Sequence, residues 1–137
     1  MKNNLKVRIG CASAFWGDTS TAAKQLVKKG DLDYLVFDFL AEVTMSILAR
    51  AKLKDSDKGF AGDFLTQVEP LLPTIKQKGI KILTNAGGIN PTSCRTMLEK
   101  AAKKEGINLK IGIVTGDDLI PELPKMEKFG ITELDTG

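Results

Sequence analysis

Polar and glycine residues gather directly after four apolar runs of this 137-residue sequence. Such runs are typical of buried parallel strands, and open α/β sheets bind ligands beyond the carboxyl ends of their strands. The residues after each run therefore form a candidate ligand-binding set. They are Ser13, Trp16 and Asp18 after the first run, Asp38 ending the second, Asn85, Gly87, Gly88 and Asn90 after the third, and Gly116, Asp117 and Asp118 after the fourth.

Residues 85–90 have the composition of an anion-binding loop. Gly87 and Gly88 would let the backbone approach a ligand, and the helix expected after Asn90 would direct free N–H groups toward a phosphate or carboxylate. The glycines could equally make only the turn, and Asn90 could serve only as the helix cap. The loop matches neither GxGxxG nor a Walker A sequence, so it identifies no nucleotide.

An acidic set could hold Mg²⁺ or supply a general acid and base, if its carboxylates converge above the sheet. Glu42 and Asp118 have a second explanation, because negative charge stabilises the first turn of a helix. Asp38 ends a very apolar run, where burial would demand a partner. Asp117 completes the set. We assign no metal ligand and no cofactor.

The sequence contains no histidine, which excludes histidine-dependent triads and histidine acid–base chemistry within it. Cys11 and Cys94 form no CxxC pair and provide too few ligands for zinc. Ser13 and Cys11 lack a histidine base, so we assign no catalytic residue. Trp16 could line an apolar pocket, but we expect it to pack on the sheet as a loop plug.

The apolar pattern places these loops between alternating strands and helices. Four runs predict strands over residues 7–12, 32–39, 80–85 and 109–115, and helical spacing predicts helices over 19–29, 40–52, 63–77 and 90–105. This alternation indicates right-handed βαβ units. We therefore predict a doubly wound, mostly parallel α/β sheet of the Rossmann or flavodoxin type.

Particular residues predict where the helices begin and end. Asp18 and Gly30 should cap the first helix, and Asn90 the fourth. Pro70 and Pro73 should split the third helix in two. The predicted buried face of the second helix comprises Leu40, Val43, Ile47, Leu48 and Ala51.

Composition restricts the partners. The net charge is +3, from 20 basic and 17 acidic residues, and the lysine pairs fall near predicted helix ends. There they favour the helix dipole rather than forming a basic stripe, so we expect no nucleic-acid partner. No apolar stretch approaches the roughly 20 residues of a membrane span, and residues 1–6 hold no signal core. We expect a cytoplasmic protein without a membrane partner.

Four ordered motifs carry a resemblance to a known family. They are VRIGCASAFWGD at 7–18, LDYLVFDFLAEVTMSILARAK at 32–52, TNAGGINP at 84–91 and VTGDDL at 114–119. Together they resemble the N-terminal region of the acyclic terpene utilisation AtuA family. The resemblance implies bacterial acyclic terpene catabolism through acyl-CoA intermediates, and it assigns no catalytic residue. It also implies that residues 1–137 are a single α/β domain of a longer architecture.

Two interpretations of function follow. In the first, the chain is all or part of an enzyme that binds a small organic acid or its CoA thioester through Asp38 and residues 85–90. In the second, it is a noncatalytic binding subunit that needs a partner or more chain. Because a four-stranded sheet would leave open edges, we expect a homo-oligomer or completion by additional chain. A nucleotide-binding regulatory role would rest on fold analogy alone.

Overall fold

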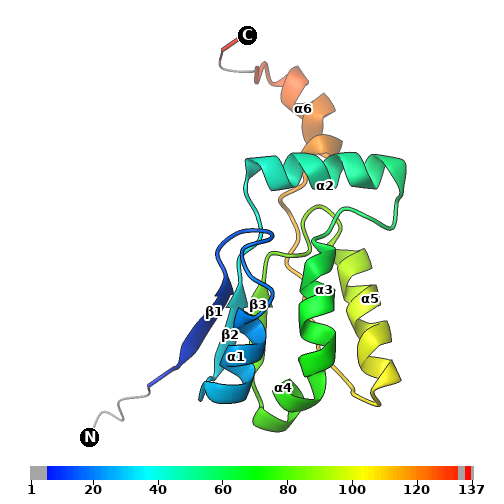
Figure 1. The fold of residues 1–137 in the computed structure, drawn as a ribbon. Helices are drawn as coiled ribbons and strands as arrows, with labels where there is room; N and C mark the ends of the chain where they lie inside the picture. Colours follow the sequence, from blue (N-terminus) through cyan, green and yellow to red (C-terminus); the bar gives the residue numbers. More distant parts are fainter. Residues whose placement is uncertain (1–5, 133–134, 137) are drawn as a thin grey trace, which may run out of the picture.

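The protein contains a three-stranded, fully parallel sheet. A computed structural model describes residues 6–132 and 135–136, so the predictions for residues 1–5 lie outside the described residues. Strands β1 (Ile9–Ser13), β2 (Tyr34–Phe37) and β3 (Lys81–Thr84) lie side by side in that order (Figure 1). Cys11 lies opposite Val36, which lies opposite Leu83. The α/β class and the parallel sheet are confirmed.

Helices connect and follow the strands close to where the sequence predicts them. The elements are α1 (Ala22–Lys29), α2 (Glu42–Lys54), α3 (Gly62–Val68), the 3₁₀ turn η1 (Glu69–Leu71), α4 (Leu72–Lys78), α5 (Pro91–Lys104), η2 (Ile120–Glu122) and α6 (Leu123–Lys128). The predicted split at Pro70 and Pro73 is confirmed, since η1 separates α3 from α4. Asn90 caps α5, but Thr21 rather than Asp18 precedes α1.

The predicted fourth strand is wrong. Residues 109–115 pair with no strand among the described residues. Every second residue from Ile107 to Ile113 is half-buried, and Ile107 and Leu109 pack against the core. The alternation of apolar and polar residues that predicted a strand therefore corresponds to a segment buried on one side. This segment lacks the hydrogen bonds that define a sheet.

The helices cover one face of this sheet. Leu35 and Phe37 of β2 are fully buried on that face, where the Phe37 ring meets Phe64 of α3 edge-on at 5.2 Å between centroids. The opposite face presents exposed Ile9 and Leu83. Right-handed crossovers that advance in one direction place all their helices on the same side. The helices among the described residues thus lie on one face of the sheet. The doubly wound arrangement also requires helices on the second face, and these remain a prediction.

Helix α2 lies across the carboxyl ends of the strands rather than along a face of the sheet (Figure 1). It buries Thr44 and Leu48, one helical turn apart, and Leu48 lies against Gly88 in the loop that follows β3. Val43 and Ile47 are 71% and 51% exposed, so their predicted burial is wrong. A helix that lies crosswise over loops buries a narrower strip of its surface than a helix that packs along a sheet.

None of the helices in the described part of the chain has the length and apolar character needed to cross a bilayer.

Candidate functional site

Three of the predicted site residues meet at the carboxyl ends of the three strands. The Ser13 hydroxyl donates to the Asp38 carbonyl at 3.1 Å, and the Asp38 N–H donates to the Ser13 carbonyl at 3.2 Å. Asn85 Nδ2 donates to Asp38 Oδ1 at 2.7 Å, while the Phe39 N–H donates to Asn85 Oδ1 at 2.8 Å. We call Ser13, Asp38 and Asn85 the strand-end cluster.

Asp38 is the chemically available member of this cluster. Its side chain is exposed, so it is not the buried carboxylate that would demand a partner. Asn85 fixes one carboxylate oxygen, and among the described residues no hydrogen bond or ion pair reaches the other. A carboxylate oriented in this way can accept a hydrogen bond from a hydroxyl, amide or ammonium group.

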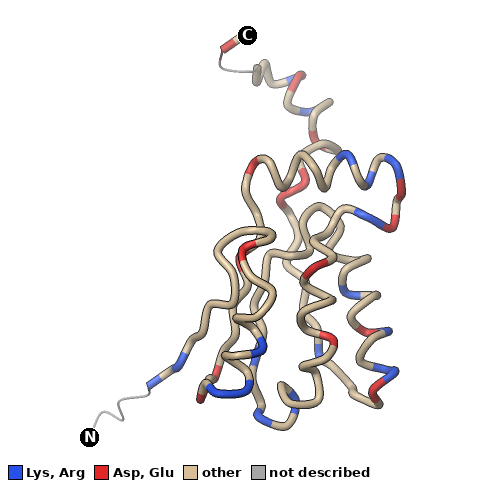
Figure 2. The backbone as a smooth tube through the Cα atoms, in the orientation of Figure 1, with Lys and Arg blue, Asp and Glu red and all other residues tan. Residues whose placement is uncertain are grey.

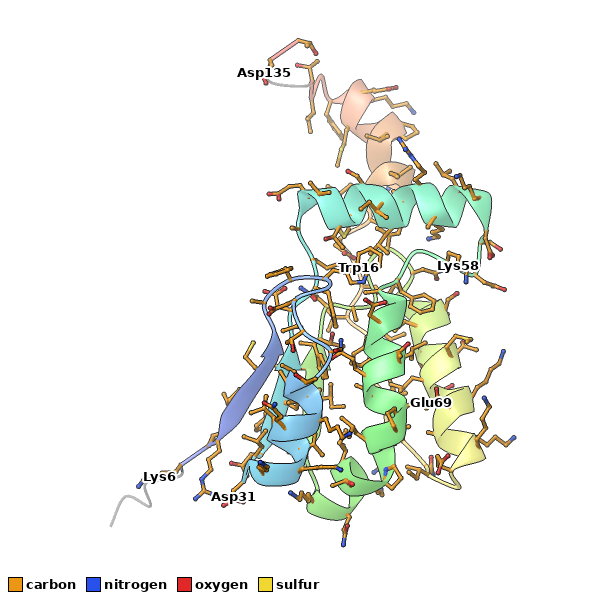
Figure 3. The ribbon with its side chains drawn as sticks, in the orientation of Figure 1. Lys6, Trp16, Asp31, Lys58, Glu69 and Asp135 are labelled. Atoms are coloured by element: carbon orange, nitrogen blue, oxygen red, sulfur yellow. The ribbon has the colours of Figure 1, made fainter. Side chains whose placement is uncertain are left out.

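The loop after β1 closes on itself beside the cluster. Asp18 accepts a hydrogen bond from the Ala14 N–H at 2.9 Å, and Gly17 takes a φ of 88°, which favours glycine. Trp16 is half-buried against the core, and Figure 3 shows it just below α2, at the end of the sheet that α2 crosses. This position fits the expected loop plug.

The glycine loop uses most of its own N–H groups. Ala86 donates to Thr84 Oγ1, Gly88 to the Asn85 carbonyl, Ile89 to the Gly59 carbonyl and Asn90 to the Gly87 carbonyl. Few donors are left for an anion. A Cβ added at Gly88 would lie 2.5 Å from Leu48 Cδ1, and its φ is 53°. These contacts favour the turn-forming role of Gly87 and Gly88 over an anion site.

Asn90 ties two loops together. Its Oδ1 accepts the Ser93 N–H at 3.4 Å, and its Nδ2 donates to the carbonyls of Ser56 and Lys58 at 2.8 and 2.7 Å. Lys52 adds a bond from Nζ to the Ile89 carbonyl at 2.8 Å. The Asn90 side chain is buried and its polar atoms are all used, which favours a structural role.

Among the described residues, no hydrogen bond or ion pair joins the fourth group of candidates to the cluster. Gly116, Asp117 and Asp118 are exposed, and the Asp118 side chain accepts the Ile120 N–H at 3.1 Å, just before η2. Within the described residues, no group of three or more acidic or cysteine side chains is placed to hold a metal ion. Figure 2 shows charges of both signs spread along the chain rather than one basic stripe.

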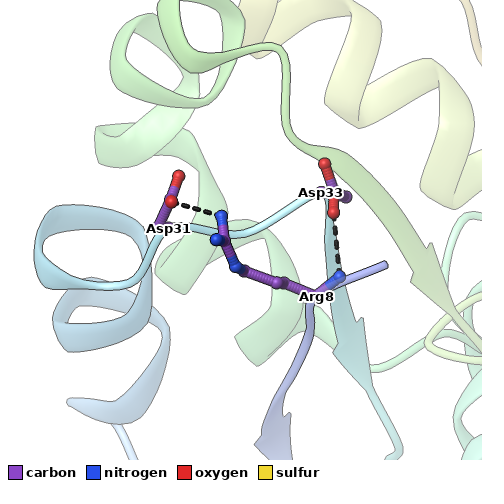
Figure 4. A network of polar contacts seen from close by, with 3 residues as sticks. All are labelled: Arg8, Asp31 and Asp33. Atoms are coloured by element: carbon purple, nitrogen blue, oxygen red, sulfur yellow. Dashed lines mark hydrogen bonds and ion pairs between the residues drawn. The ribbon is translucent and has the colours of Figure 1, made fainter. Parts of the chain in front are cut away.

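One polar network gave no signal in the sequence. The Arg8 guanidinium pairs with the Asp31 carboxylate, and the Arg8 N–H donates to Asp33 Oδ2 at 2.8 Å (Figure 4). The Asp33 N–H returns a bond to the Arg8 carbonyl at 2.9 Å. The network joins the amino ends of β1 and β2, opposite the cluster. Asp31 and Asp33 lie 23 and 25 residues from Arg8 in the sequence, too far for a local sequence pattern to indicate the pairing.

Two open hollows lie away from the strand-end cluster. One of about 560 Å³ runs along α1 and the free edge of β1, between Cys11 and Lys29. The other, of about 440 Å³, lies beside the end of α5, around Ala102 and Leu109. The cluster therefore offers directional polar groups at an exposed edge, apart from the residues that line these two hollows.

Comparison with known families gives one match. The family model for "Acyclic terpene utilisation family protein AtuA" matches residues 7–137. Comparisons with curated proteins and with solved structures give no match. The match includes every strand, every helix and the whole strand-end cluster. The chain belongs to the acyclic terpene utilisation AtuA family.

Proposed function

We propose that the strand-end cluster binds an acyl-CoA-type ligand in acyclic terpene utilisation. One observation carries the proposal: Asn85 holds the exposed carboxylate of Asp38 in place while one oxygen stays open. A fixed acceptor beyond the carboxyl ends of parallel strands is where ligands of open α/β sheets bind. Membership of the AtuA family supplies the pathway.

At Asp38 itself, charge favours the uncharged acyl and pantetheine part of a CoA thioester over a free carboxylate, and the anionic phosphates of CoA must lie away from these acidic residues. Asp38 and Asp18 both follow strand ends, and Glu42 opens α2 above them. A ligand carboxylate placed against Asp38 would meet like charge with no described cation paired to it, which is unfavourable. A CoA thioester instead offers hydroxyl and amide donors, which match an open carboxylate oxygen.

Thermal unfolding with a panel of acyl-CoA thioesters tests the proposal. A ligand that binds only the folded chain raises its stability by about 2.7 kcal/mol at one hundred times the dissociation constant. We expect Asp38→Asn to abolish this shift, because the amide keeps the size of the carboxylate but loses its charge. Asn85→Ala should weaken binding by releasing that carboxylate.

Glu105→Ala is the matched control, since Glu105 is an exposed carboxylate just past α5, at the other end of the sheet. It should leave the ligand-induced shift unchanged. Equal shifts in the parent chain, Asp38→Asn and Asn85→Ala would rule out the strand-end cluster as the binding site. A shift with free carboxylic acids, and none with thioesters, would reject the ligand class.

A further inference from the structure

Helix α2 is attached to the rest of the fold through few contacts. Of its thirteen residues only Thr44 and Leu48 are buried, while Val43 and Ile47 are exposed. Among the described elements, α2 packs closely on no other helix or strand. A segment with so few buried apolar contacts opens at a lower free energy than the core beside it. Helix α2 can therefore leave the strand ends while the sheet stays folded.

The contacts that α2 does make converge on residues 85–90, the loop after β3. Leu48 rests on Gly88, where an added Cβ would lie 2.5 Å from Leu48 Cδ1. Lys52 Nζ donates to the Ile89 carbonyl at 2.8 Å. The loop thus seats the middle of α2 and ties down its last turn.

The same loop holds the strand-end cluster. Asn85 Nδ2 donates to Asp38 Oδ1 at 2.7 Å, and Asn85 Oδ1 accepts the Phe39 N–H at 2.8 Å. Residues 39–41 lead directly from this bond into α2, which crosses the strand ends (Figure 1). One short loop therefore contacts both the carboxylate and the helix. A change at either reaches the other through bonded neighbours.

We propose that α2 is a lid over the strand-end cluster, and that residues 85–90 couple its position to the occupancy of Asp38. The inference rests on the proposed function, since the occupant is the acyl-CoA thioester. Asp38 is exposed, so a thioester bound there stays in contact with water unless a neighbouring element covers it. Lids exclude water in this way. Thioester binding and the closed position of α2 then stabilise each other.

Hydrogen exchange of the α2 amides tests the seat of the lid without any ligand. Lys52→Met keeps a side chain of similar length but loses the ammonium group that holds the Ile89 carbonyl. The amides of residues 42–54 should exchange about fivefold faster or more, while the amides of β2 keep their parent rates. Lys54→Met is the matched control, because Lys54 is exposed on the same helix.

Gly88→Ala displaces the lid from the opposite side of the same contact. Its Cβ would press on Leu48, so exchange in α2 should accelerate about tenfold or more. Gly79→Ala is the control, because Gly79 also has a positive φ, 69°, but nothing lies within 4 Å of its added Cβ. Parent rates in both Lys52→Met and Gly88→Ala would overturn the proposal. Exchange that accelerates as much in β2 as in α2 would overturn it too, since no separate lid would then exist.

Octanoyl-CoA tests the coupling to Asp38. At one hundred times its dissociation constant, this thioester should slow exchange in α2 by up to about a hundredfold, because the open lid does not hold it. The amides of α6, which lies outside the lid, should keep their rates. Asp38→Asn should abolish the slowing and leave the ligand-free exchange of α2 close to that of the parent chain.

The lid and the proposed function fail in different ways. If octanoyl-CoA raises the unfolding temperature but leaves exchange in α2 unchanged, the lid is overturned and the binding site stands. If no thioester raises the unfolding temperature, the proposed function fails and the coupling to Asp38 falls with it, even where Lys52→Met and Gly88→Ala release α2.

Discussion

Cys94 is buried, and this burial makes the stability of the fold depend on pH. Burial raises the pKa of the Cys94 thiol from 9.0 to about 11, because the apolar surroundings disfavour the thiolate. A raised pKa in the folded state stabilises the fold below the unfolded value. That contribution is therefore complete below pH 9 and is lost as the pH rises through about 11.

We predict that the parent chain loses about 2 kcal/mol of unfolding free energy relative to Cys94→Ala between pH 8.5 and 11. Urea unfolding at a series of pH values measures the difference, and the comparison cancels the titration of lysine and tyrosine common to both chains. Parallel curves for the parent and Cys94→Ala would contradict the prediction.

At the scale of elements, Asn90 holds α5 and the segment between α2 and α3 in one arrangement. Its Oδ1 caps the helix, and its Nδ2 binds the carbonyls of Ser56 and Lys58. We expect Asn90→Ala to cost about 2–4 kcal/mol, since it removes a cap and leaves two carbonyls without their donor. Denaturant unfolding measures this loss, and trypsin cleavage after Lys58 should become faster.

Asn90→Asp separates the two roles. The carboxylate keeps the cap but cannot donate to the carbonyls, so cleavage after Lys58 should still accelerate. Thr21→Ala is the control, because Thr21 stands at the cap position of α1 without a side-chain hydrogen bond. A cost for Thr21→Ala as large as that for Asn90→Ala would argue against the assigned bonds.

Local patterns predicted the elements that depend on neighbouring residues. The first three strands, the break at Pro70 and Pro73 and the cap at Asn90 follow from short-range preferences. The fourth strand failed because pairing with β3 is a long-range event that apolar alternation does not encode. The buried face of α2 failed at Val43 and Ile47, since it depends on where the helix rests.

The same distinction applies to the candidate site. Ser13, Asp38 and Asn85 come together because parallel strands end at one edge of a sheet, a consequence that the predicted topology already contains. The bond from the Ile89 N–H to the Gly59 carbonyl was beyond sequence reasoning, since its acceptor lies about thirty residues upstream, whereas the other loop N–H groups bond to residues 84–87. Asp117 and Asp118 follow no strand, because the run expected to position them pairs with no strand among the described residues.

For the whole molecule, the consequence of single winding is a sheet whose two faces contribute unequally to stability. Leu35 and Leu83 are the same residue type on adjacent strands, yet Leu35 is fully buried under the helices and Leu83 is 52% exposed on the opposite face. The order β1-β2-β3 accounts for this difference, because crossovers of one hand that advance in one direction place their helices on a single face.

We predict that Leu35→Ala costs about 3–5 kcal/mol at any protein concentration, through lost burial and a residual cavity. Leu83→Ala should cost less than about 1 kcal/mol in dilute solution, where its side chain is already half in water. Urea unfolding at two widely separated concentrations measures both. Equal costs for the two substitutions in dilute solution would mean that both faces of the sheet are already covered within one chain.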